Sequence, residues 1–190
     1  MCLNKIVISV SLSFAFLLAT PLQAADPPKV QRLGGSSSSG EKIIIGQAEY
    51  ISIPALGDVF NARIDTGATT TSIYAVNVEE FERDGKRWAR FVVKNPEKEK
   101  DYRLEMRVTR IAMIKKRGVE GETRRPSIKL DLIMGKLTKR LDVNLADRTG
   151  FEFPLLIGRD FLRGLAVVDV SLKYTQTAPD ASAVRAVGER

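Results

Sequence analysis

The residues of this chain that could do chemistry begin with Asp65, Thr66 and Gly67, which directly follow the alternating apolar stretch 59–64. A carboxylate at a strand end is held rigidly, and Gly67 has no side chain to keep backbone N–H groups away from it. The Thr66 hydroxyl can lock such a loop by hydrogen bonding. Two such carboxylates brought close together share one proton, so one serves as general base and the other as general acid. The alternative is an ordinary hairpin turn, where Asp and Gly are common.

The rest of the composition removes most competing chemistries. The chain has no histidine, which excludes Ser-His and Cys-His nucleophilic arrangements and histidine-ligated zinc. Its only cysteine, Cys2, precedes the first apolar stretch, and no Gly-Lys-Ser/Thr phosphate loop is present. The serines at 36–39 have no base beside them and are typical of a linker. We therefore expect carboxylate chemistry, with no metal and no cofactor.

The N-terminal sequence is typical of a secretory leader. Lys5 precedes the mostly apolar stretch 6–18, and small residues around Ala24 offer a cleavage region. We expect a signal peptide over residues 1–24, a flexible Gly/Ser linker over 25–41, a folded domain over 42–174 and a disordered tail over 175–190. A retained anchor is the alternative, but the stretch is short for a bilayer span. A secreted domain without disulfides predicts a periplasmic protein with no stable membrane span after cleavage.

The charge of the chain is positive. Removing residues 1–24 takes one base, Lys5, and leaves 29 basic against 23 acidic residues, a net charge of +6. The bases alternate with apolar residues in strand-like runs that hold few aromatics, which favours a solvated sheet face over a nucleic-acid surface. We expect no nucleic acid as a partner. Attraction to acidic peptides or to anionic envelope surfaces agrees with the charge.

Period-two alternation of apolar and polar residues dominates residues 42–173 and predicts strands. Turn signals stand between Pro54 and Asp58 and at Gly135, the second inside an expected hairpin. A short helix is expected over 159–163, and a weak helical candidate covers 76–83. Many short strands with so little helix predict an all-β fold, a closed antiparallel barrel with one short helix.

A second motif lies far downstream, where the apolar run 155–157 leads into Gly158, Arg159 and Asp160. Together with residues 62–72, it resembles the two signatures of retropepsin-like aspartic proteases. Within that superfamily the chain is most similar to a bacterial group usually called ATP-dependent zinc proteases, which is associated with ATP-grasp glutamate ligases. The resemblance covers about residues 43–174 and implies a retropepsin-like barrel. The sequence supports neither the zinc nor the ATP of that name, for the reasons given above.

The resemblance implies a role for each matched residue of the first signature. Asp65 would be the catalytic carboxylate, Thr66 a hydroxyl contact between subunits, and Gly67 the point of close backbone approach. Ala68 would line the substrate cleft. The stretch 111–125, which contains Gly118 and Gly121, would be the flap over the substrate.

The second signature departs from the retroviral pattern in one respect. Retroviral enzymes pair the arginine of this signature with an acid that is missing here, because the corresponding stretch is Thr69 to Thr71. The expectation is that Arg159 pairs with Asp160 or with no carboxylate.

The mature chain contains one Asp-Thr-Gly, so two carboxylates at one site require two copies of the chain. The first hypothesis is a periplasmic aspartic endopeptidase that cleaves a protein or peptide between the Asp65 carboxylates of a homodimer. The second is a proteolytically silent, retropepsin-shaped binding or regulatory module of the cell envelope. A third, weaker hypothesis makes the substrate acidic, because the surface is basic and relatives are associated with glutamate ligases.

Overall fold

A computed structural model of the chain describes residues 42–115 and 122–177. The expected signal peptide, the whole of the expected linker, and the tail beyond residue 177 lie outside the described residues. Gly118 and Gly121 also lie outside them. In the part that is described, no helix is long and apolar enough to cross a membrane.

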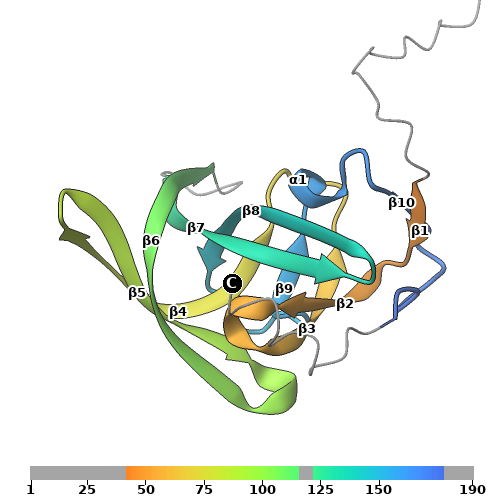
Figure 1. Cartoon of the computed structure of the whole chain (residues 1–190), viewed down its shortest axis with the longest axis horizontal. Helices are drawn as coiled ribbons and strands as arrows, with labels where there is room; N and C mark the ends of the chain where they lie inside the picture. The colour runs from red at the N-terminus through yellow and green to blue at the C-terminus, as the bar shows by residue number, and fades with distance from the viewer. Residues whose placement is uncertain (1–41, 116–121, 178–190) are drawn as a thin grey trace, which may run out of the picture. The chain divides into compact units, whose positions relative to one another are not determined.

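Strands make up most of the domain, as the period-two pattern predicts (Figure 1). Short 3-10 turns at Pro54–Leu56 and Pro96–Lys98 begin at prolines, whose fixed φ suits the start of a helical turn. The helix α1 spans Arg159–Leu162, where a short helix was predicted. The strands are β1 (Ile43–Ile45), β2 (Ala48–Ile53), β3 (Asp58–Ile64), β4 (Ser72–Arg83), β5 (Lys86–Asn95), β6 (Lys100–Lys115), β7 (Glu122–Met134), β8 (Leu137–Ala146), β9 (Leu155–Ile157) and β10 (Ala166–Val168).

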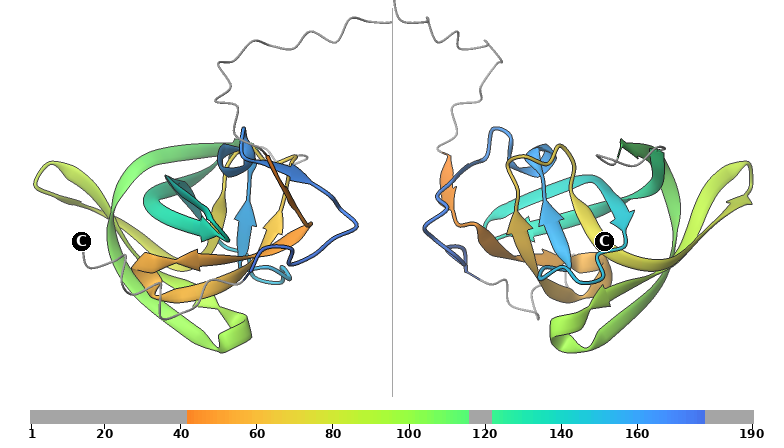
Figure 2. Two further views of the ribbon diagram at one scale, coloured as in Figure 1. Left: turned by 45° about the vertical axis from the view of Figure 1, so that its right-hand side comes forward. Right: turned by 180° about the vertical axis from the view of Figure 1, so that it is seen from behind.

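The main sheet closes into a ring, which confirms the predicted closed all-β fold with one short helix. Its strands run in the order β2-β3-β9-β4-β5-β6-β7-β8, and the ring closes where β2 meets β7 and β4 meets β8. Most neighbours are antiparallel, as expected. The pairs β3–β9, β4–β8 and β1–β10 are parallel, which the antiparallel prediction did not include. The strand β9 lies between β3 and β4, and so behind the chain segment that joins them (Figure 2, right).

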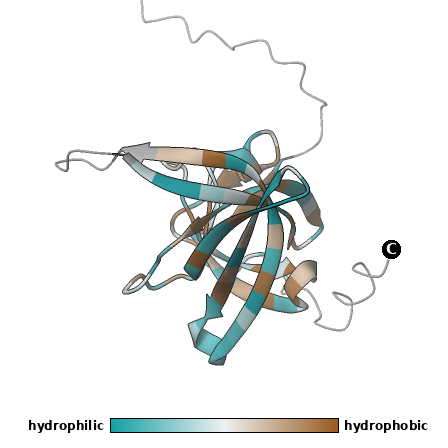
Figure 3. Ribbon diagram, turned by 90° about the vertical axis from the view of Figure 1, so that its left-hand side faces the viewer, coloured by the Kyte–Doolittle hydropathy of each residue, from teal (hydrophilic) through white to brown (hydrophobic). Residues whose placement is uncertain are grey.

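The core fills the inside of this ring. Alternate residues of β3 point inward, so Phe60, Ala62 and Ile64 are buried, as their spacing predicts. Hydrophobic and hydrophilic bands alternate along the strands in Figure 3. Phe91, Ile128 and other large apolar side chains complete the core from the facing strands. Burial of this set is the main force that holds β3 and β9 in place under the Asp65 loop.

Residues 76–83 form the outer half of β4, so the weak helical prediction there is wrong. This segment pairs with β5 from Glu79 opposite Arg90 to Arg83 opposite Lys86. The resulting hairpin extends away from the ring (Figure 1, left). Cross-strand pairing satisfies its backbone groups, and this outweighs the weak helical spacing of its side chains.

A buried carboxylate, Glu49, ties β2 to the end of the described chain. Its side chain accepts hydrogen bonds from the Gly46 N–H at 2.7 Å, the Thr175 hydroxyl at 2.6 Å and the Gln176 N–H at 3.1 Å. Several donors are needed here because a buried charge without partners is costly. The bonded part of the domain therefore continues two residues beyond the expected boundary at 174.

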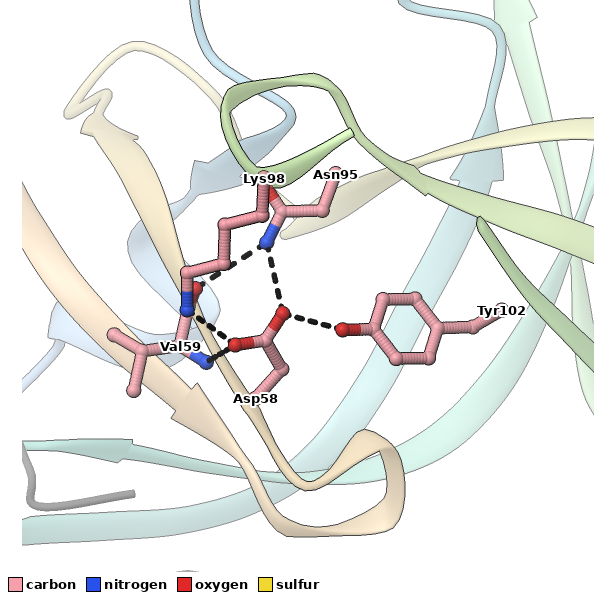
Figure 4. A network of polar contacts seen from close by, with 5 residues as sticks. All are labelled: Asp58, Val59, Asn95, Lys98 and Tyr102. Carbon is pink, nitrogen blue, oxygen red and sulfur yellow. Dashed lines mark hydrogen bonds and ion pairs between the residues drawn. The ribbon is translucent and has the colours of Figure 1, made fainter. Parts of the chain in front are cut away.

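A second buried carboxylate, Asp58, joins the β2–β3 turn to the β5–β6 hairpin (Figure 4). It accepts hydrogen bonds from Lys98, Tyr102, the Asn95 amide at 3.1 Å and the Val59 N–H at 2.8 Å. Burial alone raises the pKa of Asp58, but the bonds from Lys98, Tyr102 and Val59 outweigh it and leave that pKa below its usual value. Burial and the Asp58 carboxylate together raise the pKa of Tyr102.

We expect Asp58→Asn to lower the free energy of unfolding at neutral pH by about 1–3 kcal/mol, because Lys98 and Tyr102 lose the charged acceptor of their hydrogen bonds at this buried position. The folded-state pKa of Asp58 is depressed, so its stabilisation is present above the unfolded pKa and lost as pH falls through the folded one. Urea titrations should show the difference at neutral pH and its disappearance in strong acid.

The control for this measurement is Asp101→Asn on the same hairpin. Asp101 makes an exposed ion pair with Lys94 at 2.6 Å, and exposed pairs contribute about 0–1 kcal/mol. Equal losses in the two variants, or a loss for Asp58→Asn that persists at low pH, would contradict the account of the Asp58 network.

Candidate active site

Asp65 is the first residue after β3 and begins a tight loop. Its N–H donates to the Ile157 carbonyl at 2.9 Å, so β9 fixes the start of the loop. Its Oδ1 accepts hydrogen bonds from the N–H groups of Gly67 at 2.9 Å and Ala68 at 3.0 Å. A Cβ on residue 67 would lie 3.2 Å from this Oδ1, which agrees with the predicted close backbone approach at Gly67. Within the described residues Oδ2 accepts no hydrogen bond, which leaves it available to a reacting group.

Arg159 holds the same loop from behind. Its Nη1 donates to the carbonyls of Thr66 at 3.0 Å and Gly67 at 2.6 Å, and its Nη2 donates to the Thr69 hydroxyl at 2.9 Å. Its own backbone N–H donates to the Ala68 carbonyl at 2.9 Å. Of the two expected arrangements for Arg159, pairing with Asp160 or with no carboxylate, the second is found, because within the described residues no carboxylate forms an ion pair with it. Threonines occupy the place of the retroviral acid, and the guanidinium binds loop carbonyls and one of those hydroxyls.

Asp160 instead fixes Thr71, a residue that sequence reasoning did not single out. The carboxylate accepts hydrogen bonds from the Thr71 N–H at 2.8 Å and its hydroxyl at 2.7 Å. The buried Thr71 hydroxyl also accepts the Gly158 N–H at 3.2 Å. A Cβ on Gly158 would lie 2.7 Å from the Thr70 carbonyl carbon. The whole second signature therefore packs directly against residues 65–71.

Thr66 and Ala68 differ in their exposure. The exposed Thr66 lies beside α1 and β10 at the rim of a hollow of about 270 Å³, with Leu162 and Val168 among its other lining residues. Ala68 is half-buried. The contact of Thr66 with a second subunit and the place of Ala68 in a cleft stay predictions.

The expected flap corresponds to the β6–β7 hairpin. Residues from Ile111 to Lys115 pair with those from Glu122 to Pro126. This pairing of β6 with β7 agrees with the expected flap over residues 111–125. The contribution of Gly118 and Gly121 to substrate binding stays a prediction.

Arg148 is a cation near Asp65 that the sequence motifs did not identify as a site residue. It is only 8% exposed, and its Nε donates to the Phe153 carbonyl at 2.9 Å while Nη1 contacts the Ser72 hydroxyl at 3.4 Å. Burial lowers the pKa of Arg148 and the charge of Arg125 lowers it further, whereas the Asp65 carboxylate raises it. A buried cation held by neutral acceptors is costly, so Arg148 is a further candidate site residue.

A pocket of about 650 Å³ adjoins this cation. It is lined by β4 from Ala75 to Val78, by β7 from Thr123 to Pro126, and by the segment after β8 that includes Asp147 and Thr149. Arg124 and Arg125 make its β7 wall basic, although Arg124 also lies 3.8 Å from Glu80. A pocket between the flap and the inner end of β4 is a suitable place for a substrate side chain.

The residues present do not fit the zinc of the group name. The chain has no histidine, and residues 42–115 and 122–177 bring together no set of three or more potential Cys, Asp or Glu ligands. Zinc sites in proteins use three or four such ligands.

Comparisons with known proteins agree with this geometry. Residues 44–179 match the family described as the retropepsin-like aspartic endopeptidase RimB. A probable alpha-L-glutamate ligase of Desulfotalea psychrophila is 34% identical over 136 residues, and one of Parasynechococcus marenigrum is 31% identical over 130. These matches cover 70% and 67% of this chain but only 29% and 28% of the ligases. This chain therefore spans less than a third of the length of these curated relatives.

A solved structure shares the fold. It is a Legionella pneumophila protein of unknown function, with a TM-score of 0.60 and 30% identity, and the match covers 72% of this chain and all of that one. The match to the family spans both signatures, the Asp65 loop and the Gly158–Asp160 segment behind it. The chain belongs to the RimB-like family of retropepsin-like aspartic endopeptidases.

Proposed function

We propose that this protein is a periplasmic aspartic endopeptidase whose active site forms between the Asp65 residues of two copies of the chain. The observation that carries the proposal is the arrangement at Asp65. One oxygen is fixed by two backbone N–H groups, the other is available, and Arg159 holds the loop rigid. Such preorganisation is what an acid–base carboxylate needs.

The chemistry requires a second carboxylate. Close to its partner, one Asp65 is ionised and the other protonated. The ionised carboxylate takes a proton from a water, whose oxygen attacks the carbonyl carbon of the scissile peptide bond. The protonated carboxyl gives its proton to the carbonyl oxygen. The carboxyl that took the proton from water then gives it to the amide nitrogen, while a hydroxyl of the tetrahedral intermediate returns a proton to the other carboxylate. The C–N bond breaks, an acid and an amine leave, and the pair again holds one proton.

Dimerisation follows from counting the carboxylates. The chain offers one Asp-Thr-Gly, so a twofold axis beside Asp65 is the simplest way to bring two together. The exposure of Thr66 supports this arrangement, because a hydroxyl at the loop tip is free to meet its equivalent.

The substrate is proposed to be a protein or peptide with acidic side chains. Arg124 and Arg125 line the 650 Å³ pocket, and the buried Arg148 lies in the chain between two of its lining residues, Asp147 and Thr149. The relatives named as glutamate ligases are consistent with acidic chains in the same biological setting. The periplasmic location rests on the leader, and N-terminal sequencing of the protein recovered from cell fractions tests it.

The experiment for the proposed function combines sedimentation with a peptide-library digest over a range of protein concentrations. We expect cleavage to rise with the fraction of dimer and to favour peptides rich in Asp and Glu at low salt. A protein that stays monomeric and cleaves nothing would support the silent binding module instead. Cleavage without preference for acidic peptides would contradict the proposed substrate class, while the assignment as a peptidase would stand.

A further inference from the structure

The β4–β5 hairpin diverges from β6 at a defined point. The last β5–β6 pair is Trp88 opposite Arg107. From Val108 onward, β6 pairs only with β7, after a bulge between Val108 and Arg110. The backbone edges of β5 before Trp88 and of β6 after Arg107 thus face each other without pairing. A groove of about 260 Å³ lies between them.

The side chains that line this groove are strongly basic. Lys86, Arg87, Arg107 and Arg110 are exposed and line it together, and no acidic residue lines it. Within the described residues none of these four cations makes an ion pair.

The nearest acids do not neutralise the groove. Glu105 is bound by Arg83 and Arg90. Asp142 is bound by Lys129 at 2.9 Å and by Thr109 at 2.7 Å, and the charge of Arg110 also lowers its pKa, so Asp142 faces one of the four cations but forms its ion pair with Lys129. Glu82 is the residue of β4 that lies opposite Arg87 in the β4–β5 register, and Asp84 lies in the turn between these strands. Four cations around one hollow therefore keep a net positive field, which concentrates anions.

We propose that this groove is a docking site for an extended acidic peptide segment of a partner or substrate, separate from the Asp65 site. An extended peptide can pair with the open edge of β6 while alternate carboxylates reach the cations on either side. Charge complementarity identifies the occupant. The segments of this chain outside the described residues are not acidic, because residues 1–41, 116–121 and 178–190 each hold at least as many bases as acids.

The surroundings favour a peptide over a single-stranded nucleic acid. Nucleic-acid grooves use exposed aromatic faces on which bases stack. The aromatic ring at the end of this groove, Trp88, has the Arg83 guanidinium 4.8 Å from its centre. One face of this ring is therefore already occupied by a cation.

The test is a binding titration by fluorescence anisotropy, in the Asp65→Asn background so that no peptide is cleaved. The probe is a labelled peptide of alternating glutamate and alanine. Lys86→Glu with Arg107→Glu should weaken binding about tenfold, because two attractions become repulsions. Lys136→Glu with Lys173→Glu, at exposed positions elsewhere, changes the net charge equally and should leave affinity within about twofold. Unchanged urea midpoints must accompany both results.

Three outcomes would overturn the proposal. Equal weakening in both double variants would assign binding to net charge alone. Loss of binding in Arg125→Glu but not in the groove variant would place the peptide in the 650 Å³ pocket that Arg124 and Arg125 line. Tighter binding of a single-stranded oligonucleotide, abolished by the groove variant, would make the ligand a nucleic acid.

A probe N-methylated at alternate residues should bind more weakly, because it cannot complete the pairing with β6.

Discussion

Asp65→Asn should reduce peptide cleavage by about 10³-fold or more while leaving the fold intact, since acid–base catalysis supplies a factor of that order. An amide keeps Oδ1, so it still accepts the N–H groups of Gly67 and Ala68 that shape the loop. It cannot take a proton from water. Digestion of a peptide library, read by mass spectrometry at equal dimer concentrations, measures the loss.

The matched control is Asp169→Asn. Asp169 begins a similar turn, in which its Oδ1 accepts the Ser171 N–H at 2.9 Å and the Ser171 hydroxyl at 2.6 Å. It lies away from the Asp65 loop in the chain and should tolerate the change with full activity. Wild-type cleavage by Asp65→Asn would remove Asp65 from the chemistry. A similar loss in both variants would point to unfolding rather than catalysis.

Gly158→Ala should have the largest effect on stability. The new Cβ would lie 2.7 Å from the Thr70 carbonyl carbon and 2.8 Å from its oxygen, both backbone atoms that cannot swing away. We expect the free energy of unfolding to fall by about 2–3 kcal/mol, the usual cost of overpacking. The Asp65 loop must shift to relieve the clash, so cleavage should fall as well. Urea denaturation and the same peptide digest measure the two effects.

The control for Gly158→Ala is Gly164→Ala, which changes the backbone preference of a glycine without creating a steric clash. Gly164 has a φ of +82° with open space around its Cβ position, so alanine there costs only the left-handed conformation, about 1 kcal/mol. Activity should be unaffected. If Gly158→Ala were no more destabilising than Gly164→Ala, the packing of the second signature against Thr70 would not support the Asp65 loop.

The fold could be predicted because its signals are local and repeated. Alternation at Phe60, Ala62 and Ile64 gives both the strand and its buried face, and Gly135 marks the β7–β8 hairpin. The two signatures carry the family, since each is a short run with a fixed spacing of chemically distinct residues. The position of Asp65 at the end of β3 follows from the same pattern.

The missed features depend on contacts between distant segments. The parallel placing of β9 beside β3 is a matter of topology, which alternation does not record. Thr71 gains its role only because Asp160 folds back onto it. Arg148 is one of many bases in a basic sequence, and its burial near Asp65 becomes visible only when Ser72 and Phe153 surround it. A spacing-based prediction of residues 76–83 could not anticipate the pairing with β5.

The most direct test of the central claim, that two copies of Asp65 make one active site, is a subunit-mixing experiment. Wild type and Asp65→Asn are mixed at constant total concentration, allowed to exchange subunits, and assayed for cleavage. If both carboxylates of a dimer are required, activity should follow the square of the wild-type fraction, roughly one quarter at an equal mixture. Activity proportional to the wild-type fraction, roughly one half at the same point, would show that one Asp65 suffices and would contradict the account.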